Sequence, residues 1–537
     1  MNTSLPKSFP EHGSIHIDYN PAIRLFGKRF FSEQTLVELV TEFLSVVFSP
    51  KWIGEGAAID TPLPPLEDLK CWPENVGLSY KPPVKLNLKL FSFLSISRVD
   101  TRHETHKKQY ENLYKKLKSQ ISINKGDVEE AIGWIEELLR GFQGAGFNRA
   151  WCAQNFFPVT KSLLTQETIW NVSVSKREPL NNWKDSINNF HKYFSISKHR
   201  FMARGGELLY LQLCNIFNIS ETRIMDFARR IGFSDEESDL SKLHQSLQDI
   251  LQTLDGSNTS NLDKLVNYIE SIDLDTHEKS NQKVKRLECE WCPKDSWQEG
   301  YLFAVEIRRL LSSVMDPIER LEMFVTGCAL QVLRSICAQS VRYSDDALYT
   351  KGSMLGYAWL FTPPDSPSQQ QRMVSQRNLQ ANLGLIQKAL RHGELKKNAA
   401  KAAPRKSVES LYKEADNKYG HKLFLSLGKK MGIIAPFRGP GARFIMTDSI
   451  IQYMVLVLLR PGERCTYDDF LRRLYLHFGI AIEGEELEDA VIWSGLPANS
   501  SMQPHNGSWL EDMLRAGGFL KELSDACSIV CNNFGKA

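Results

Sequence analysis

The stretch GKKMGIIAPFRGPGARFIMTD, residues 428–448 of this 537-residue chain, decides how its last part is predicted to fold. Two lysines end a predicted helix, and the apolar segments IIAPF and ARFIMT lie on either side of the tip RGPG. Because glycine adopts the backbone angles of a tight reversal without steric cost, this pattern predicts a β-hairpin. Arg438 and Arg443 flank its tip.

Helical periodicity surrounds the hairpin. Residues 407–420 begin with Ser407 as a predicted cap, residues 421–434 keep their apolar side chains on one stripe, and a third helix opens at Thr447. This order is typical of winged helix-turn-helix domains, in which a helix enters the major groove and the hairpin reaches the neighbouring backbone. We therefore predict a winged-helix-like domain with an acidic tail over residues 407–537.

The predicted nucleic-acid-binding residues are the basic side chains of the second helix and the hairpin. They are Lys422, Lys429, Lys430, Arg438 and Arg443. Lysine and arginine so placed would meet phosphate oxygens and base edges of double-stranded DNA. Two other interpretations stay open: a winged helix that docks a protein, and a surface turn that is basic by chance.

Charge is unevenly distributed along the same region. Residues 391–443 hold thirteen Lys or Arg and four Asp or Glu, whereas residues 444–537 hold seven basic and thirteen acidic residues. The basic segment is typical of a surface that binds polyanions. The acidic segment would repel DNA, so we expect it to face solvent or a protein partner.

The whole chain is predicted to be mainly α and multi-domain, because its length exceeds one ordinary core. Residues 1–125 form a mixed region with a long loop, residues 126–362 an irregular helical domain, and residues 363–406 a Pro/Ser-rich and then basic linker or helix. In the first region the alternating apolar residues of VKLNLKLFSFL, residues 84–94, predict a strand.

Composition and cysteine usage indicate a soluble protein. The hydrophobic share is 42% and the charged share is 24%, as in folded soluble domains. Ten cysteines without regular spacing and a polar N-terminus predict reduced thiols in the cytoplasm. The longest strongly apolar run, MVLVLL, is far shorter than the roughly 20 residues of a membrane span, so no membrane contact is predicted.

Two further motifs could carry function. Cys289 and Cys292 have the spacing of half a zinc site, but a structural zinc needs four ligands, so they are weak metal candidates. In RFMARGGELLYLQL, Arg204 and Glu207 flank two glycines inside a helical pattern. This motif predicts either close packing of two helices or an Arg-Gly-Gly contact with an anion or backbone, with Glu207 orienting Arg204.

The motifs of several enzyme classes are missing from the sequence. It contains no Gly-x-x-x-x-Gly-Lys-Ser/Thr phosphate loop, no dinucleotide-binding fingerprint, no Gly-x-Ser-x-Gly elbow and no His-Glu-x-x-His. No cofactor and no catalytic residue is therefore predicted. Scattered carboxylates of a metal-dependent nuclease have no fixed spacing, so that class stays an alternative.

KLFSFLSISRVDTRHETH, RFMARGGELLYLQL and the basic C-terminal region together resemble proteins of bacterial anti-phage defence islands. The chain is most similar to the non-ATPase component of methylation-associated defence systems, and more distantly to the accessory proteins of phosphorothioation-dependent restriction. The resemblance covers most of the chain and implies a HerA/FtsK-like DNA-translocating ATPase as partner. It implies no catalytic residues.

The resulting hypothesis is a non-catalytic DNA-binding subunit of a defence complex that works with a separate ATPase. A metal-dependent nuclease subunit and a structural adaptor whose winged domain binds protein are the alternatives.

Overall fold

The computed structural model describes most of the chain. Outside it lie residues 1–3, 12–18, 29, 95–102, 123–125, 145–149, 196–203, 234, 255–260, 273–284, 345–352, 366–367, 402–405, 498–508, 525–526 and 536–537. The structure is 61% helical and 9% strand, so the prediction of a mainly α protein is confirmed.

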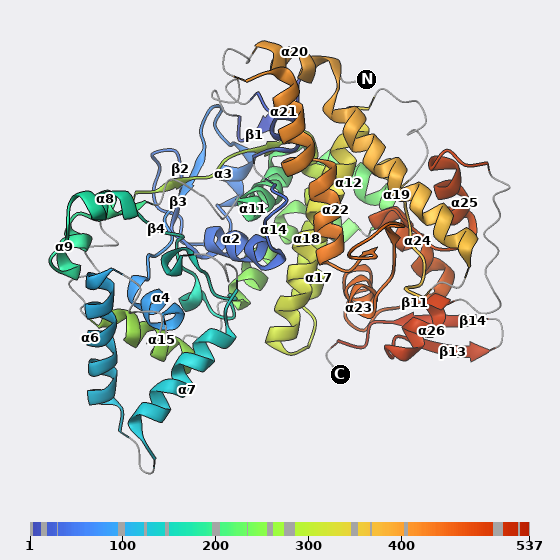
Figure 1. Ribbon diagram of the computed structural model, residues 1–537. Coiled ribbons are helices and arrows are strands. Elements are labelled where there is room, and N and C mark those ends of the chain that lie inside the picture. Colours follow the sequence, from blue (N-terminus) through green and yellow to red (C-terminus); the bar gives the residue numbers. More distant parts are fainter. Residues whose placement is uncertain are drawn as a thin grey trace.

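Four helices form the centre of the molecule (Figure 1). They are α2 (Leu36–Phe48), α11 (Gly205–Asn215), α17 (Trp297–Leu311) and α18 (Pro317–Arg342). α11 packs on α2 and α17, and α18 packs on α17 and α2. All eleven residues of α11 are buried, because neighbouring elements cover the helix on all sides.

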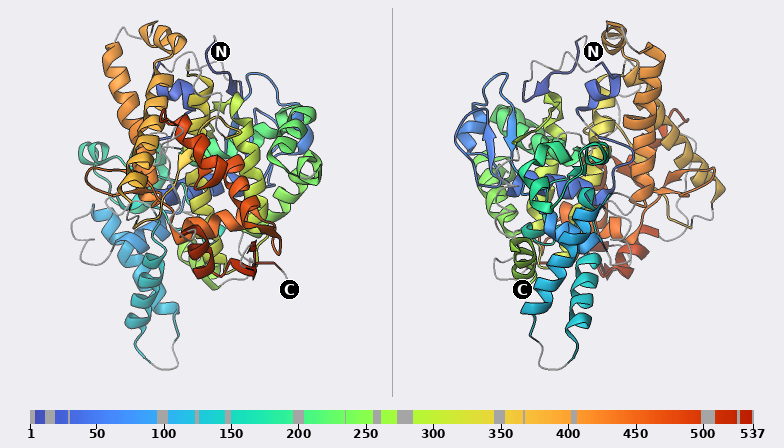
Figure 2. Two further views of the ribbon diagram at one scale, coloured as in Figure 1. Left: turned by 90° about the vertical axis from the view of Figure 1, so that its right-hand side faces the viewer. Right: turned by 60° about the vertical axis from the view of Figure 1, so that its left-hand side comes forward.

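A helical arm lies on one side of this centre, and Figure 2 shows two of its helices protruding together. The arm contains α4 (Leu86–Phe93), α6 (Glu104–Gln120), α7 (Val128–Gly141), α8 (Val172–Arg177), α9 (Trp183–Asn188), α10 (Phe190–Tyr193) and α15 (Asn261–Ser271). Around the centre lie α1 (Pro21–Phe26), α3 (Leu66–Lys70), α12 (Glu221–Ile231), α13 (Asp235–Ser238) and α14 (Leu240–Thr253). The protruding pair is α6 and α7.

The strand predicted within residues 84–94 is wrong, because α4 occupies this place. All eight residues of α4 are buried, including Lys89. Lys89 donates hydrogen bonds from Nζ to the carbonyls of Cys152 and Gln166, at 3.0 and 2.7 Å. A helix buried on every side has no polar face, so its apolar spacing does not separate it from a strand.

The C-terminal half packs against the other side of α18. Its helices are α19 (Gln369–Leu390), α20 (Gly393–Lys401), α21 (Val408–Glu414), the π-helix η7 (Ala415–Tyr419), α22 (His421–Lys430), α23 (Asp448–Leu458), α24 (Tyr467–Phe478), α25 (Gly484–Trp493) and α26 (Trp509–Ala516). α19 contacts α18, α22 and α25, so the middle of the predicted linker is a packed helix.

The strands are short, and most of them join distant segments. The sheets are β2 (Lys51–Ile53) with β3 (Leu78–Tyr80) and β6 (Leu287–Glu288); β11 (Arg464–Thr466) with β14 (Cys527–Cys531) and β13 (Leu520–Ser524); and the pairs β1 (Ser8–Phe9) with β7 (Cys292–Pro293), β4 (Ile169–Trp170) with β5 (Phe194–Ser195), β8 (Trp359–Leu360) with β12 (Ile480–Ala481), and β9 (Ile434–Ala435) with β10 (Arg443–Phe444). The β8–β12 pair is parallel.

One connected cluster of buried apolar side chains extends from Phe9 to Val530. Residues of all four predicted units belong to it, so they share a core. The division at residues 125, 362 and 406 stays a prediction.

Among the described residues, α18 alone is long and apolar enough to cross a membrane by length and composition. It has 26 residues, but 89% of its most apolar window is buried inside the protein. Such burial is typical of a core helix in a soluble protein.

Candidate nucleic-acid interface

The predicted hairpin is present and its root is anchored in the core. β9 and β10 are antiparallel, with Ile434 opposite Phe444 and Ala435 opposite Arg443. Ile434 and Phe444 are buried, and the ring of Phe444 stacks on that of Phe361 with centroids 5.5 Å apart. α22 precedes the hairpin and α23 follows it, as predicted. Whether these elements form a winged helix-turn-helix domain stays a prediction.

The tip of the hairpin is exposed. Gly439 and Gly441 have φ angles of +95° and +84°, which side chains rarely adopt, so two glycines are needed for this reversal. Phe437 is 62% exposed, and Arg438 beside it is exposed as well. Within the described part of the chain, the guanidinium of Arg438 has no ion pair or hydrogen bond. A cation on a rigid exposed turn is available to an anionic partner.

Arg443 lies at the root of the hairpin, and its guanidinium group makes a hydrogen bond within the protein. Its Nη2 donates a hydrogen bond to the Pro364 carbonyl at 2.6 Å. Burial, with a further contribution from nearby Arg372, lowers the pKa of Arg443. Two neighbouring guanidinium groups favour an anion between or beside them. Arg443 therefore connects the root of the hairpin to the segment that precedes α19, and it does not extend the exposed tip.

The N-terminal turns of α19 lie against the hairpin and add basic residues that the sequence did not assign. α19 contacts β10, and a Cβ atom on Gly441 would be 3.3 Å from Nε2 of Gln376. Arg372 lies one turn before Gln376, and Arg377 follows it; both arginines are exposed. The spacing within the helix could have predicted a basic stripe, but its packing on the hairpin depends on the tertiary fold.

The three lysines of α22 do not have the same environment. Lys422 and Lys429 are seven residues apart, which places them on the same face two turns from one another. Neither side chain has an ion pair or hydrogen bond with a residue that the structure describes. Lys430, in contrast, donates from Nζ to the carbonyls of Ser32 and Gln34 at 3.2 and 2.8 Å. Burial of its ammonium group lowers the pKa of Lys430.

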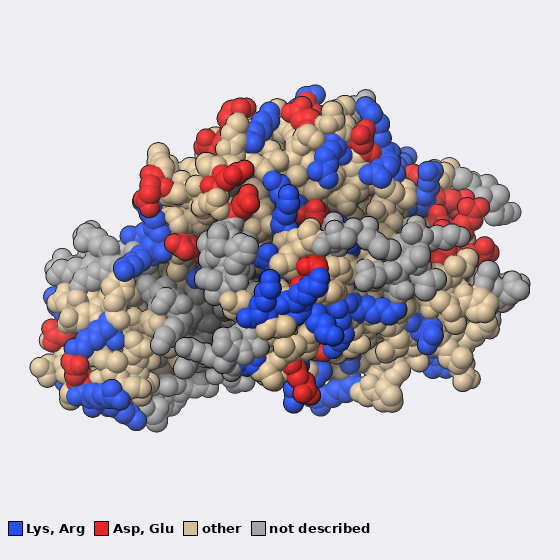
Figure 3. All heavy atoms as spheres, turned by 90° about the horizontal axis from the view of Figure 1, so that it is seen from above, with Lys and Arg blue, Asp and Glu red and all other residues tan. Residues whose placement is uncertain are grey.

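The rest of the basic segment is on α20, α21 and the following turns. Figure 3 looks down on these helices and shows Lys and Arg side chains near the middle of this face, with acidic side chains scattered around them. Three of the four acids of the segment pair with neighbours: Glu394 with Lys397, Glu414 with Lys406 and Asp416 with Arg391. Lys396, Lys401 and Lys413 are exposed.

The Arg-Gly-Gly motif lies at the start of α11 and packs tightly on α2. A Cβ atom on Gly206 would be 2.2 Å from the Leu39 carbonyl oxygen, so only glycine fits there. The backbone of the motif also contacts a carboxyl group inside the protein. The Glu42 carboxyl accepts hydrogen bonds from the backbone N–H groups of Arg204 and Gly206, both at 2.8 Å. The glycines therefore pack closely on α2, and a contact of this motif with an external anion stays a prediction.

The side chains of Arg204 and Glu207 lie 3.6 Å apart, from Nε to Oε1. Glu207 also accepts a hydrogen bond from the Tyr80 hydroxyl at 2.6 Å and is buried. Arg204 donates from Nη1 to the Glu288 carbonyl at 3.0 Å. These contacts tie α11 to β3 and β6, so both residues are engaged within the fold.

Cys289 and Cys292 are buried free thiols beside β6 and β7. Burial raises the pKa of both thiols above the ordinary value. Among the described residues no group of three or more His, Cys, Asp or Glu side chains could hold a metal ion.

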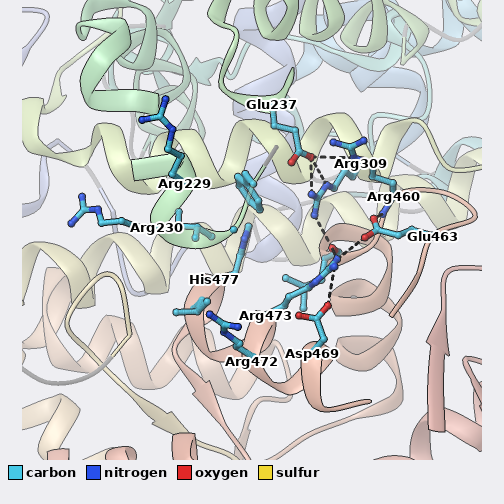
Figure 4. Close-up of a pocket in the computed structure, with 15 residues that line it drawn as sticks. Arg229, Arg230, Glu237, Arg309, Arg460, Glu463, Asp469, Arg472, Arg473 and His477 are labelled. Atoms are coloured by element: carbon cyan, nitrogen blue, oxygen red, sulfur yellow. Dashed lines mark hydrogen bonds and ion pairs between the residues drawn. The ribbon is translucent and has the colours of Figure 1, made fainter. Parts of the chain in front are cut away.

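A cavity of about 480 Å³ that the sequence did not predict lies between α12, α17 and α24. Six arginines line it, together with Glu237, Glu463 and Asp469. Figure 4 shows these side chains and the ion pairs among them. The arginines come from positions as distant as 229 and 473, so no local motif could have assigned them to one site.

Comparison with known proteins gives no relative: no family model, curated protein or solved structure matches the chain significantly.

Proposed function

We propose that this chain is a non-catalytic, DNA-binding subunit of a bacterial anti-phage defence complex that acts in the cytoplasm with a separate DNA-translocating ATPase. The observation that carries the proposal is the exposed hairpin tip, whose Arg438 has no acidic partner among the described residues. Lys422 and Lys429 on the preceding helix and Arg372 on α19 add positive charge around the same hairpin.

The arrangement suits the backbone of duplex DNA. Phosphate contacts need cations that are exposed and not already paired, because a paired guanidinium must first give up its carboxylate. Arg438 and Lys422 meet this condition, and Lys429 is half-buried but has no ion pair or hydrogen bond with a described residue. Arg443 and Lys430 meet it less well, because backbone carbonyls already hold their charged groups.

The test is the salt dependence of binding to a 30-base-pair duplex, measured by fluorescence anisotropy on the full chain. Each phosphate contact contributes about −0.9 to the slope of log K against log salt. Arg438→Glu, and the double variant Lys422→Glu with Lys429→Glu, should weaken binding and reduce the slope by about one unit per lost contact. Lys115→Glu on the protruding helix α6 is the matched control.

Equal affinity and slope for the wild type, the hairpin variant and the control would exclude the hairpin as a DNA contact. Cleavage of plasmid by the purified protein in Mg²⁺ or Mn²⁺ would contradict the non-catalytic role and favour the nuclease alternative. Co-purification with a HerA/FtsK-like ATPase encoded beside it would support the proposed complex.

Docking of a protein is the second candidate for the same hairpin, and the exposure of Phe437 favours it. An aromatic ring at an exposed tip is typical of a binding anchor in protein interfaces. Phe437→Ser should abolish capture of a protein partner while leaving the salt slope of any duplex binding unchanged. A smaller slope in this variant would place the ring in the DNA interface instead.

A further inference from the structure

The arginine-lined cavity has the size and position of a small-molecule site. Its volume of about 480 Å³ lies within the range of roughly 300–1,000 Å³ that ligand pockets occupy. Three helices from distant parts of the chain, α12, α17 and α24, surround it, together with the turn after α23. The proposed DNA-binding residues do not line it.

Part of the charge in the cavity is balanced within the fold. Arg309 donates to the Glu237 carboxylate from Nη2 at 2.7 Å and to the carbonyls of Val457 and Leu458 from Nη1. Arg473 lies 2.7 Å from Glu463 and 2.9 Å from Asp469. These two arginines form a fixed inner wall.

Three other arginines of the lining have no carboxylate partner within the cavity. Arg229 pairs only with exposed Asp226 on its own helix, at 3.7 Å, and Nε of Arg230 donates to the Asp226 backbone carbonyl. Arg472 has no ion pair or hydrogen bond with any described residue. α12 and α24 pack on one another, and Arg230 and Arg472 both line the cavity, with the Arg230 side chain extending outward in Figure 4. A guanidinium group without a carboxylate partner can bind phosphate with two parallel hydrogen bonds.

Beside these arginines the cavity is lined by the aromatic rings of Phe233 and His477, and one ring nitrogen of His477 has no hydrogen-bond partner among the described residues. Phe233 is half-buried, with Arg309 5.0 Å from its ring centre and the ring of His477 at 5.7 Å. His477 is 1% exposed and uses Nε2 for the Glu306 carboxylate. Its Nδ1 has no hydrogen-bond partner among the described residues. Buried polar atoms are usually paired, so this nitrogen is available to accept a hydrogen bond from a ligand group.

We propose that this cavity binds a phosphorylated small molecule of the size of a mononucleotide. Arg230 and Arg472 hold its phosphate, and its ring lies beside Phe233. The cavity lies between helices and its volume matches a small molecule, which suits a free nucleotide better than a continuous nucleic-acid strand. Such a site would let a soluble nucleotide control the chain independently of the proposed DNA surface.

Isothermal titration of the full chain with AMP, GMP, CMP, UMP, inorganic phosphate and a single-stranded 12-mer tests the proposal. At least one mononucleotide should bind, and Arg472→Gln or Arg230→Gln should each weaken it about tenfold or more. Phe233→Leu should weaken the nucleotide but leave inorganic phosphate unchanged. Arg177→Gln, an exposed arginine on distant α8, is the matched control and should bind like the wild type.

Several results would overturn the proposal. They are the absence of binding by every mononucleotide, equal affinity for inorganic phosphate and nucleotide, binding of the 12-mer alone, or an equal loss in the Arg177 control. Circular dichroism spectra verify that the variants fold. The salt slope of duplex binding should stay unchanged in Arg472→Gln, so failure here is distinguishable from failure of the proposed DNA contact.

Discussion

Arg334 and Glu306 form a two-pronged ion pair that is buried between α18 and α17, with Nη1–Oε1 and Nη2–Oε2 distances of 2.6 and 3.0 Å. The Tyr453 hydroxyl donates to the same carboxylate at 2.9 Å, and His477 donates to it from Nε2. This carboxylate therefore joins the central helices to α23 and α24. It also lies next to the proposed nucleotide cavity, because His477 belongs to both.

The first prediction concerns this ion pair. Glu306→Gln leaves the Arg334 charge uncompensated in the core and should lower the free energy of unfolding by about 3–5 kcal/mol. Burial raises the pKa of Glu306, but Arg334 and His477 together outweigh burial and lower this pKa to about 2. Since the folded pKa is lower than the unfolded one, the stabilisation is present above about pH 4.5 and is lost as the pH falls toward 2.

Urea unfolding followed by circular dichroism measures this effect. Lys397→Ala, which removes the exposed pair with Glu394, is the control and should cost less than about 1 kcal/mol. Similar costs for the two variants would show that the buried pair contributes no more than a surface one.

The second prediction concerns the contact of α11 with α2. Gly206→Ala would place a Cβ atom 2.2 Å from the Leu39 oxygen and 2.5 Å from the Phe43 nitrogen, so the helices must move apart. Such overpacking costs about 1–3 kcal/mol or more. Gly133→Ala on α7, where a Cβ atom would meet nothing within 4 Å, should be stabilising by up to about 1 kcal/mol. Thermal melts of both variants test this difference in sign.

The sequence predicted features that depend on neighbouring residues and missed those that depend on distant ones. The hairpin at residues 434–444 could be predicted because its glycines and apolar strands lie within one short segment. α4 could not, because burial on all sides removes the polar face that marks a helix. The partner of the Arg-Gly-Gly motif could not be named either, since Glu42 lies 162 positions before Arg204 in the chain.

The residues of the candidate sites also fall into those that the local sequence predicts and those that depend on the tertiary fold. Lysine and arginine near residue 430 were visible as a basic segment, but only the fold separates exposed Arg438 from Arg443, which bonds to Pro364. The arginines of the cavity come from α12, α17, α24 and the turn after α23, and those on the helices occur in ordinary amphipathic patterns. Their convergence results from tertiary packing, for which a single sequence carries no local signal.

The third prediction concerns Glu42. Burial raises the pKa of Glu42 to about 8. The hydrogen bonds from the N–H groups of Gly206 and Arg204 lower this pKa, but burial outweighs them. The folded protein therefore holds a proton that the unfolded chain loses near pH 4.5. The contribution of Glu42 to stability is full below that pH and decreases as the pH rises to 8. In Glu42→Gln this dependence should disappear.

Unfolding free energies at pH 5, 6, 7 and 8 measure the difference between wild type and Glu42→Gln. The free energy of unfolding of the wild type, minus that of Glu42→Gln, should fall by on the order of 1 kcal/mol for each pH unit of increase. Glu488→Gln, at an exposed position on α25, should show a constant difference. A constant difference for Glu42→Gln as well would mean that its carboxyl has an ordinary pKa.

The last prediction separates two adjacent lysines of α22. Lys430→Met removes the hydrogen bonds to Ser32 and Gln34, which lie just before the Thr35 cap of α2, and should cost about 1 kcal/mol of stability. It should also speed amide exchange in the first turn of α2. Because this ammonium group is engaged within the fold, the salt slope of duplex binding should not change. Lys429→Met should behave in the opposite way, with unchanged stability and exchange but a smaller slope. If Lys430→Met reduced the slope as much as Lys429→Met, both lysines would contact the DNA and the distinction drawn from their hydrogen bonds would be wrong.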